Sequence, residues 1–361
     1  MRILSVCSAR PNFVKLAAVH HAVRVAKNRD VDHVIVHTGQ HYDPLFSDVF
    51  FEQLQIPLPH VNLEIHGGTR EDVITRTEKA IVPVLTREDP DVILVYGDVN
   101  GALGAARGAI QAGLPIAHVE AGLRSFDQSM PEETNRIAID MISQLLFCTE
   151  KSGVEHLRSA HVNGAVHLVG NTMIDTLVRM LPAIERQDLP RKVKLPFAVA
   201  TLHRPSNVDS KDALEENLRF LASVSSRCRI VLPAHHRLES RIDEFQLRSL
   251  IPKTVHLTGP LGYLPFLRLV QQSLFVLTDS GGIQEEATFL KKRCFTLRKN
   301  TERPSTIESG SNVLIDIDQS RDRQVVLAYA ESPVPPDVTI PPLWDGKAGE
   351  RILSLLLSDI L

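Results

Sequence analysis

The stretch Leu277-Thr278-Asp279-Ser280-Gly281-Gly282-Ile283-Gln284-Glu285-Glu286-Ala287 predicts a buried strand, a tight turn and the start of a helix. Two glycines after Ser280 let the backbone approach a ligand closely, and the free N–H groups of a helix start favour a phosphate. Glu285 and Glu286 would fall in the first helical turn, where one carboxylate can accept hydrogen bonds from ribose hydroxyls. A nucleoside diphosphate fits this arrangement. An ordinary glycine-rich turn, with an acidic pair that compensates the helix dipole, fits it as well.

The composition of the whole chain is that of a water-soluble protein with two domains. It has 361 residues, of which 43% are hydrophobic and 23% charged, and a formal net charge of −3. We therefore expect no general attraction for nucleic acid or for an anionic membrane surface. No apolar run approaches the roughly 18 residues of a membrane span. The apolar run at residues 3–7 is too short for the hydrophobic region of a signal sequence.

The four cysteines, Cys7, Cys148, Cys228 and Cys294, are widely spaced. They form no CxxC pair and no grouping with histidine that has the spacing of a zinc site. Free thiols in a cytoplasmic protein are the simplest interpretation, and we expect no metal.

Strand-like runs alternate with helix-like runs along the chain, which is typical of a parallel, doubly wound sheet. The strand-like runs are 3–8, 32–38, 92–96, 116–119, 145–148, 197–201, 229–232, 254–257 and 274–277. The pattern restarts after a proline-containing, charged stretch at 181–196, which we interpret as a solvated connection. The expected fold is α/β, with two Rossmann-like domains at 1–170 and 171–342 and a terminal helix within 343–361. Two such domains would face a cleft at the carboxyl ends of their strands, where open α/β sheets bind ligands.

Polar residues follow the strands of the first domain. The loop after the first strand lacks the GxGxxG pattern of a dinucleotide site, so we expect no bound NAD. Arg10 in that loop can fork onto a phosphate, but for this residue alone a surface arginine is the better interpretation.

Three carboxylates, Asp98, Glu120 and Glu132, should gather near the carboxyl edge of the first sheet. Carboxylates beside an anionic substrate would have raised pKa values, which suits general acid and base catalysis. The alternative is structural: helix capping by Glu132 or its neighbour Glu133, with salt bridges to Arg124 and Arg136.

The second domain offers His203 and His235 at strand ends, where a histidine can pair with a diphosphate or serve the structure. Metal binding by His235 and His236 is weakly supported, because adjacent side chains point apart. Phe266 can stack on a base or pack in the core. A further polar turn, 301–306, contains Arg303.

Together these motifs resemble the UDP-N-acetylglucosamine 2-epimerase family, in the same order along nearly the whole chain. The matching stretches are 9–15, 96–98, 118–125, 130–133, 170–172, 201–204, 279–286 and 301–304. The resemblance implies a glycosyltransferase-B-like architecture, with UDP held mainly by the second domain and the sugar facing the first. It also implies a terminal helix that returns to the first domain, a homodimer, and no cofactor.

The roles that the resemblance implies are carried over residue by residue. Asp98, Glu120 and Glu132 would act at the sugar, with His203 near the leaving phosphate. The diphosphate would be held by Arg10, His235, Ser280, Gly281 and Gly282, the ribose by Glu286 and the uracil by Phe266, and Lys15 and Arg303 would also contact the substrate.

The family's chemistry avoids a carbanion at C2, whose hydrogen is not acidic. UDP leaves C1 as the C2 proton is lost, giving a 2-acetamidoglucal, and proton and UDP are then returned with the proton on the opposite face. A hydrolysing epimerase would differ only in the fate of that intermediate.

Two departures from the family's pattern leave the substrate and its regulation open. The chain has Pro205 and Ser206 where many family members have Arg-Glu, and Gln40-His41-Tyr42-Asp43 differs from the pattern associated with allosteric activation by substrate. A relative acting on a UDP-diacetamido uronic acid would look similar, with Arg124 or Arg136 as the extra basic group. A glycosyltransferase would share the fold, but the Glu-x7-Glu pattern common in retaining enzymes is missing. Eight residues after Glu285 and Glu286 the chain has Arg293 and Cys294, where that pattern would place its second glutamate.

Overall fold

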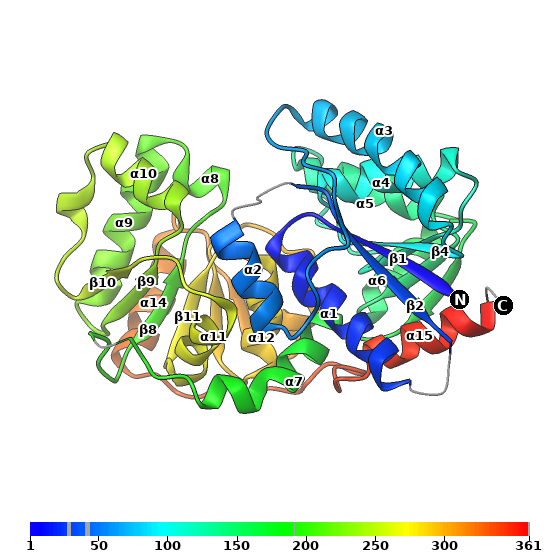
Figure 1. Cartoon of the computed structure of the whole chain (residues 1–361). Coiled ribbons are helices and arrows are strands. Elements are labelled where there is room, and N and C mark those ends of the chain that lie inside the picture. The colour runs from blue at the N-terminus through cyan, green and yellow to red at the C-terminus, as the bar shows by residue number, and fades with distance from the viewer. Residues whose placement is uncertain (27–29, 40–43, 191, 360–361) are drawn as a thin grey trace. The chain divides into compact units, whose positions relative to one another are not determined.

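Short runs of apolar residues form two parallel sheets in the computed structural model (Figure 1). The structure describes residues 1–26, 30–39, 44–190 and 192–359. Within these, the chain divides into a first unit, Met1–Met180 with Pro342–Leu361, and a second unit, Leu181–Pro341. The break at 180/181 falls inside a helix, α7 (Thr172–Glu185).

The first unit holds a sheet with the order β3-β2-β1-β4-β5-β6-β7 among the described residues, and all its strands are parallel. Its strands are β1 (Arg2–Cys7), β2 (Asp32–His37), β3 (Val61–Asn62), β4 (Val92–Tyr96), β5 (Ile116–Val119), β6 (Leu145–Cys148) and β7 (Ala165–Leu168). Its helices, besides α7, are α1 (Arg10–Val25), α2 (Pro44–Gln53), α3 (Arg70–Glu88), α4 (Asn100–Gln111), α5 (Pro131–Ile142), α6 (Lys151–Ser159) and α15 (Ala348–Asp359).

The second unit repeats this plan with the order β10-β9-β8-β11-β12-β13, again parallel throughout the described part. Its strands are β8 (Ala198–Thr201), β9 (Ile230–Pro233), β10 (Val255–Thr258), β11 (Phe275–Thr278), β12 (Arg293–Thr296) and β13 (Asn312–Leu314). Its helices are α8 (Pro205–Val208), α9 (Lys211–Ser225), α10 (His236–Glu244), the short 3₁₀ helix Arg248–Leu250, α11 (Tyr263–Gln272), α12 (Gly281–Phe289), α13 (Pro304–Glu308) and α14 (Ser320–Glu331).

Helices cover both faces of the first sheet. Side chains of α3, α4 and α5 pack on one face in a single buried cluster with residues of β1, β2 and β4. The chain's last helix, α15, lies against α1 (Figure 1). A Cβ at Gly349 would clash with the carbonyl of Ala18, so this contact requires glycine. Asp175 on α7 accepts a hydrogen bond of 2.7 Å from the Gly349 amide, which ties the start of α15 to the first unit.

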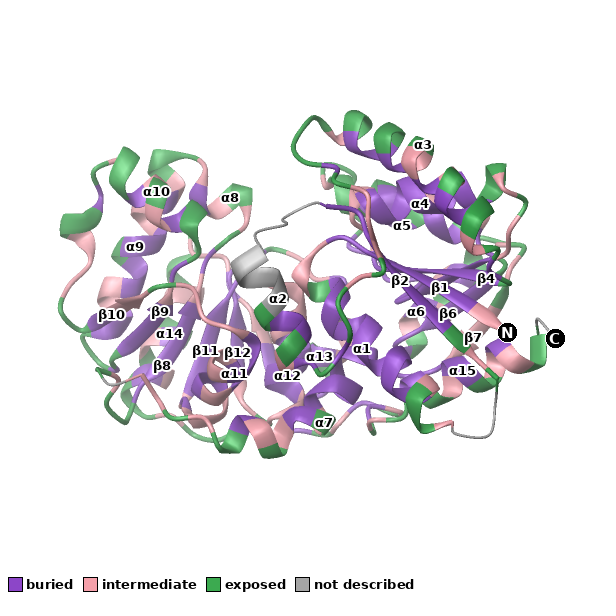
Figure 2. Cartoon of the chain, in the orientation of Figure 1, coloured by how far each residue is buried: buried purple, intermediate pink, exposed green. Residues whose placement is uncertain are grey.

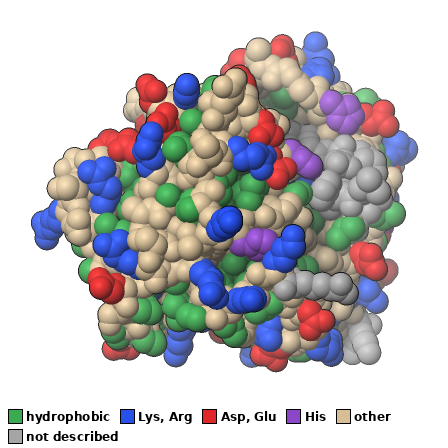
Figure 3. Space-filling model, turned by 90° about the vertical axis from the view of Figure 1, so that its left-hand side faces the viewer, with side chains coloured by type: hydrophobic (Ala, Val, Ile, Leu, Met, Phe, Trp, Pro, Cys, Tyr) green, Lys and Arg blue, Asp and Glu red, His purple; other side chains and the backbone are tan. Residues whose placement is uncertain are grey.

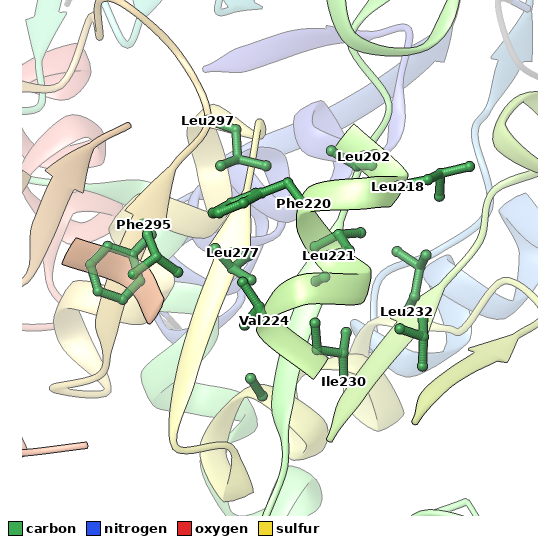
Figure 4. Close-up of a cluster of buried hydrophobic side chains, with 14 of the residues drawn as sticks. Leu202, Leu218, Phe220, Leu221, Val224, Ile230, Leu232, Leu277, Phe295 and Leu297 are labelled. Carbon is green, nitrogen blue, oxygen red and sulfur yellow. The ribbon is translucent and has the colours of Figure 1, made fainter. Parts of the chain in front are cut away.

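The core of the second unit lies between its sheet and the flanking α9 and α14. Leu218, Leu221 and Val224 of α9 pack with Leu277 and Phe295 from neighbouring strands (Figure 4). In both units the central strands are buried and the outer sides of helices are exposed, as Figure 2 shows. This burial on both faces explains why a strand such as Val92–Tyr96 is apolar at every position.

The prediction of two Rossmann-like parallel sheets is confirmed. The strand order 3-2-1-4-5-6 is that of dinucleotide-binding folds. In each sheet the order in which successive strands are added reverses at one point, between β1 and β4 in the first sheet and between β8 and β11 in the second. The polar loops that follow these strands therefore gather at one edge of each sheet.

One local expectation was wrong. Residues 181–185 continue α7 instead of forming a solvated connection, and Ile184 is fully buried, because the apolar face of the helix runs past Pro182. The Gln40–Asp43 stretch lies outside the described residues.

The surface and the cysteines agree with the composition. All four cysteines are buried free thiols. Charged side chains of both signs are interspersed on the face that Figure 3 presents. None of the helices that the structure describes has the length and apolar character needed to span a bilayer.

Candidate active site residues

The turn between β1 and α1 is fixed by Asn12. Its side-chain oxygen accepts hydrogen bonds from the amides of Ser8 (3.1 Å) and Ala9 (3.0 Å), and its amide group donates to the Tyr96 carbonyl (2.9 Å). Asn12 thus joins the ends of β1 and β4 at the point where the sheet reverses. The sequence motifs gave this residue no role; its signal was a polar residue close to a predicted helix start.

The first of the predicted acids, Glu120, forms a buried ion pair with Lys15 of α1. Both side chains are more than nine-tenths buried. Glu120 follows β5 with a φ of 73°, a left-handed conformation that costs a non-glycine residue about 1 to 3 kcal/mol. Strain of this kind persists where a site requires it, so Glu120 and Lys15 are candidates for chemistry.

Gly97 follows β4 beside this ion pair. Its φ is 65°, and a Cβ at this position would stand 2.9 Å from Glu120 Oε2 and 3.0 Å from Lys15 Nζ. Any side chain here would displace the pair, so the turn between β4 and α4 requires glycine.

The second predicted acid, Asp98, is one-quarter exposed and forms an ion pair with the buried Arg136 of α5. Arg136 also holds Glu133, with 2.5 Å between Nη1 and Oε2. Glu133 in turn accepts hydrogen bonds from the amide and the hydroxyl of Ser125, each at 2.9 Å. Of the two adjacent glutamates, Glu133 therefore serves the structure.

Glu132, the third predicted acid, is exposed on the first turn of α5. The structural alternative holds for its neighbour, because Arg136 pairs with Glu133 and also with Asp98. Helix periodicity explains the difference, since adjacent positions point about 100° apart and only Glu133 faces the sheet.

In the second unit, the end of β11 orients a histidine at the end of β8. Asp279 is fully buried and lies 2.6 Å from Nδ1 of His203, whose side chain is half exposed. Asp279 also accepts hydrogen bonds from the amides of His203 and Arg204, each at 2.9 Å. Burial would raise the pKa of Asp279, but the His203 ring and these amides lower it to about 2. The carboxylate fixes the ring so that Nε2 is the nitrogen available to a ligand.

Helix α12 begins at Gly281, one residue before the Gly282 that the sequence predicted, and Ser280 is its N-cap. The Ser280 side chain makes no capping hydrogen bond within the described residues, so the first-turn N–H groups are not satisfied by it. Arg303 lies over the turn: a Cβ on Gly281 would stand 2.5 Å from Arg303 Nη1.

Arg303 belongs to a buried ionic network around this turn. It pairs with Glu302 and lies 3.1 Å from Glu285, and Arg298 also bonds Glu302 at 2.8 Å. Burial alone would raise the pKa of Glu302, yet the guanidinium groups of Arg303, Arg298 and Arg204 hold it well below its usual range. Arg303, expected at the substrate, therefore also organises the loop that follows β12.

The prediction that Glu285 and Glu286 lie in the first turn of α12 was wrong, because the helix starts at Gly281 and its first turn contains no acidic residue. Both glutamates are buried. The pKa of Glu286 is raised to about 8, chiefly by burial and also by the charge of Glu285, while the hydrogen bond of Tyr263 lowers it. Oε1 of Glu286 has no hydrogen-bond partner among the described residues. A ribose hydroxyl would satisfy it.

The remaining predicted residues lie on or beside helices α1, α10 and α11. Arg10 is the first residue of α1, and its guanidinium stands 5.3 Å from the centre of the Phe50 ring. His235 is the exposed N-cap of α10 and accepts a hydrogen bond of 3.4 Å from the Arg237 amide. Phe266, on α11, is partly buried and packs against two core clusters of the second unit. No cluster of three or more potential metal ligands occurs among the residues that the structure describes.

Comparison with known proteins gives a consistent answer. Residues 23–357 match the family model described as UDP-N-acetylglucosamine 2-epimerase. A UDP-N-acetylglucosamine 2-epimerase of Methanocaldococcus jannaschii is 36% identical over 368 residues, which cover 99% of this chain and 99% of that protein. The UDP-2,3-diacetamido-2,3-dideoxy-D-glucuronate 2-epimerase of Pseudomonas aeruginosa is 38% identical over 321 residues, which cover 87% and 88% of the two chains.

A solved structure is also similar over the whole chain. The crystal structure of the M. jannaschii UDP-GlcNAc 2-epimerase in complex with UDP-GlcNAc and UDP has a TM-score of 0.90 and 34% identity, and covers 99% of this chain and 100% of that one. The fold is therefore of the glycosyltransferase-B-like type. With most of its length matched, this chain belongs to the UDP-N-acetylglucosamine 2-epimerase family.

Proposed function

We propose that this protein interconverts UDP-N-acetylglucosamine and UDP-N-acetylmannosamine without net hydrolysis. The observation that carries the proposal is the buried Lys15–Glu120 pair, which lies where the first sheet reverses and is held by a strained backbone. Membership of the family and the bound UDP-GlcNAc and UDP of the M. jannaschii structure support it.

In the proposed binding mode, the second unit holds UDP. The N–H groups at the start of α12 and the Gly281–Gly282 backbone would bind the diphosphate, as helix N-termini do for phosphates. Glu286, with its unpartnered Oε1, would accept from or donate to the ribose hydroxyls. Phe266 would present its partly exposed ring to the uracil. Arg10 and His235 would add charge-assisted hydrogen bonds.

In the proposed reaction, the acids of the first unit act on the sugar. A carboxylate takes the C2 proton, the electrons of the C–H bond form the C1–C2 double bond, and UDP leaves C1 with the electron pair of its bond. In the return step, the electron pair of the C1–C2 double bond takes up a proton on the opposite face of C2. An oxygen of UDP then supplies the electron pair of the new bond to C1. Asp98, Glu120 and Glu132 are the proposed acid and base groups.

His203 would assist departure of the diphosphate. Asp279 holds its Nδ1 at 2.6 Å, so Nε2 can donate a hydrogen bond to the leaving oxygen. Because the carboxylate of Asp279 fixes the orientation of the His203 ring, the ring would not have to rotate before it donates this hydrogen bond.

A second candidate substrate is the UDP-diacetamido uronic acid, because the P. aeruginosa enzyme named for it is 38% identical. Its sugar carboxylate would need a cation. The two arginines proposed for that role are both engaged: Arg124 pairs with Asp140 at 2.7 Å, and Arg136 pairs with Glu133 and Asp98. Their engagement supports the neutral sugar.

The test is incubation with UDP-N-acetylglucosamine in D2O, followed by NMR. We expect deuterium at C2 and a mixture of two epimers with UDP still attached. Free N-acetylmannosamine and UDP would indicate a hydrolysing enzyme. An unchanged sugar, with turnover of the uronic acid offered in parallel, would overturn the proposal in favour of the second substrate.

A further inference from the structure

Behind the Gly97–Asp98 turn lies a buried histidine whose two ring nitrogens both face acceptor atoms. His118, on β5, is fully buried. Its Nε2 lies 2.8 Å from the carbonyl oxygen of Gly97, and its Nδ1 lies 2.7 Å from Oδ1 of Asp140 on α5. A carbonyl oxygen can only accept, so Nε2 must carry a proton.

The state of Asp140 decides whether Nδ1 carries one too. Its second oxygen lies 2.7 Å from Arg124 Nη1, and the amide of Gly122 donates to both oxygens at 3.3 Å. A guanidinium and an amide donor both favour the ionised carboxylate. An ionised carboxylate accepts only, so Nδ1 must donate to it.

We propose that His118 is held as a doubly protonated imidazolium and acts as a positioning residue for the acid and base groups of the reaction. Through the Gly97 carbonyl it fixes the peptide that leads into Asp98. The proposal rests on the proposed function, because the turn matters to catalysis only if Asp98 and Glu120 act on the substrate.

The geometry around Gly97 shows why its peptide must be fixed. The Lys15–Glu120 pair occupies the space that a Cβ on Gly97 would need. The next carbonyl, of Asp98, accepts a hydrogen bond of 2.9 Å from Asn135, and the Asp98 side chain is held by Arg136. From β5, His118 holds the preceding carbonyl, of Gly97. A rotated peptide would shift both acids together.

The protonation state is tested by ¹⁵N NMR of the histidine side chains at neutral pH, with His118 assigned from the signal missing in His118→Gln. We expect both ring nitrogens of His118 to show an attached proton. In Asp140→Asn we expect a neutral ring with one protonated nitrogen, because the carboxylate that balances the charge is gone. An unprotonated nitrogen in the wild type would overturn the proposal, whatever the enzyme's activity.

The positioning role is tested by kinetics on His118→Ala and His118→Gln. We expect kcat to fall about tenfold to a hundredfold in His118→Ala, since small displacements of reacting groups have effects of that size. A glutamine amide can still donate to the Gly97 carbonyl, so His118→Gln should recover part of this loss. KM and UDP affinity should stay within about twofold, as expected when only transition-state contacts are lost.

The matched control is His20→Gln, another buried histidine of the first unit, which lies 3.2 Å from the ring of His33. Its kcat should be unchanged. Equal loss in His20→Gln, or a parallel loss of UDP affinity in the His118 variants, would show a general structural effect and overturn the positioning role. If the wild type turns over no UDP-sugar, the proposed function fails while the NMR result still decides the state of His118.

Discussion

The carboxyl edges of the two sheets share a strand order but differ in how their charges are arranged. At the first edge, Glu120 and Asp98 each pair with one buried cation, Lys15 and Arg136. At the second edge, the carboxylates of Asp279 and Glu302 each bind several donors within the protein. The groups that remain to bind a ligand are the ring of His203 and the N–H groups at the start of α12. We propose that one topology thus supports a proton-transfer edge in the first unit and an anion-binding edge in the second, because function depends on the residues placed on a fold.

The largest effect should come from the proton-transfer edge. Replacing Glu120 with Gln keeps an acceptor for Lys15 but removes the acid or base group, so kcat should fall by about a hundredfold to ten-thousandfold. UDP affinity, measured by calorimetry, should stay within about fivefold. The matched control is Glu155→Gln on the exposed side of α6, which should be active. Collapse of UDP binding in Glu120→Gln would mean that Glu120 is structural and that the two edges are not functionally distinct.

The next effect tests whether the first unit also contributes to anion binding. Arg10→Ala removes a proposed charged hydrogen bond to the diphosphate, worth about 1.5 to 3 kcal/mol, so the Kd for UDP should rise about tenfold to a hundredfold. Titration calorimetry measures this. The control, Arg87→Ala, removes an exposed arginine of α3 that pairs with Glu88 and should leave the Kd unchanged. An unaltered Kd in Arg10→Ala would confine anion binding to the second unit.

A third prediction concerns the pH dependence of stability at the anion-binding edge. The pKa of Glu286 is raised from 4.5 to about 8 in the folded protein, chiefly by burial. Between these values the folded state keeps a proton that the unfolded chain has lost, so this group's contribution is fully present below pH 4.5 and disappears as the pH rises through about 8.

Glu286→Gln mimics the protonated form and should therefore flatten this dependence. Relative to wild type, the free energy of unfolding of Glu286→Gln should rise with pH across the window, by at most about 1.4 kcal/mol per pH unit. Urea denaturation at several pH values measures it. Glu308→Gln, exposed on α13, is the control and should track wild type. A constant difference between Glu286→Gln and wild type would show that Glu286 is ionised throughout.

The smallest effect should come from Phe266. Leu keeps much of the packing that this partly buried side chain makes with both core clusters, but it cannot stack on a base. Loss of an aromatic contact of about 1 kcal/mol should raise the Kd for UDP about fivefold. Binding of inorganic pyrophosphate, which lacks the base, should not change. Equal weakening of both ligands would place Phe266 in the core only.

The fold followed from local patterns in the sequence. The strands Val92–Tyr96, Ile116–Val119 and Leu145–Cys148 begin and end at the predicted residues, because apolar runs bounded by polar residues reveal buried strands directly. Strands β3, β7, β12 and β13 were not predicted, and β3 and β13 have only two and three residues. β7 is only partly buried and contains His167, and β12 begins with Arg293, so neither has an uninterrupted apolar run.

The sequence supplied the candidate residues of the site but not their pairing. Sequence indicated that Asp98, Glu120 and Glu132 would gather, and only the structure distinguished the exposed Glu132 from the buried Glu133. The sequence motifs included Asp279 but indicated no role for it. The structure shows that Asp279 orients His203.

By itself, the sequence determined the two parallel sheets, the turn at Ser280–Gly282 and the family, since hydrophobic periodicity and glycine-bearing motifs are properties of neighbouring residues. Only the tertiary structure decided which charges meet: Lys15 reaches Glu120 across 105 positions of the chain. It also left both nitrogens of His118 facing acceptors. The reason is physical: the pairing of charges and the protons they hold depend on distances of a few ångströms between segments far apart in sequence, which no local pattern contains.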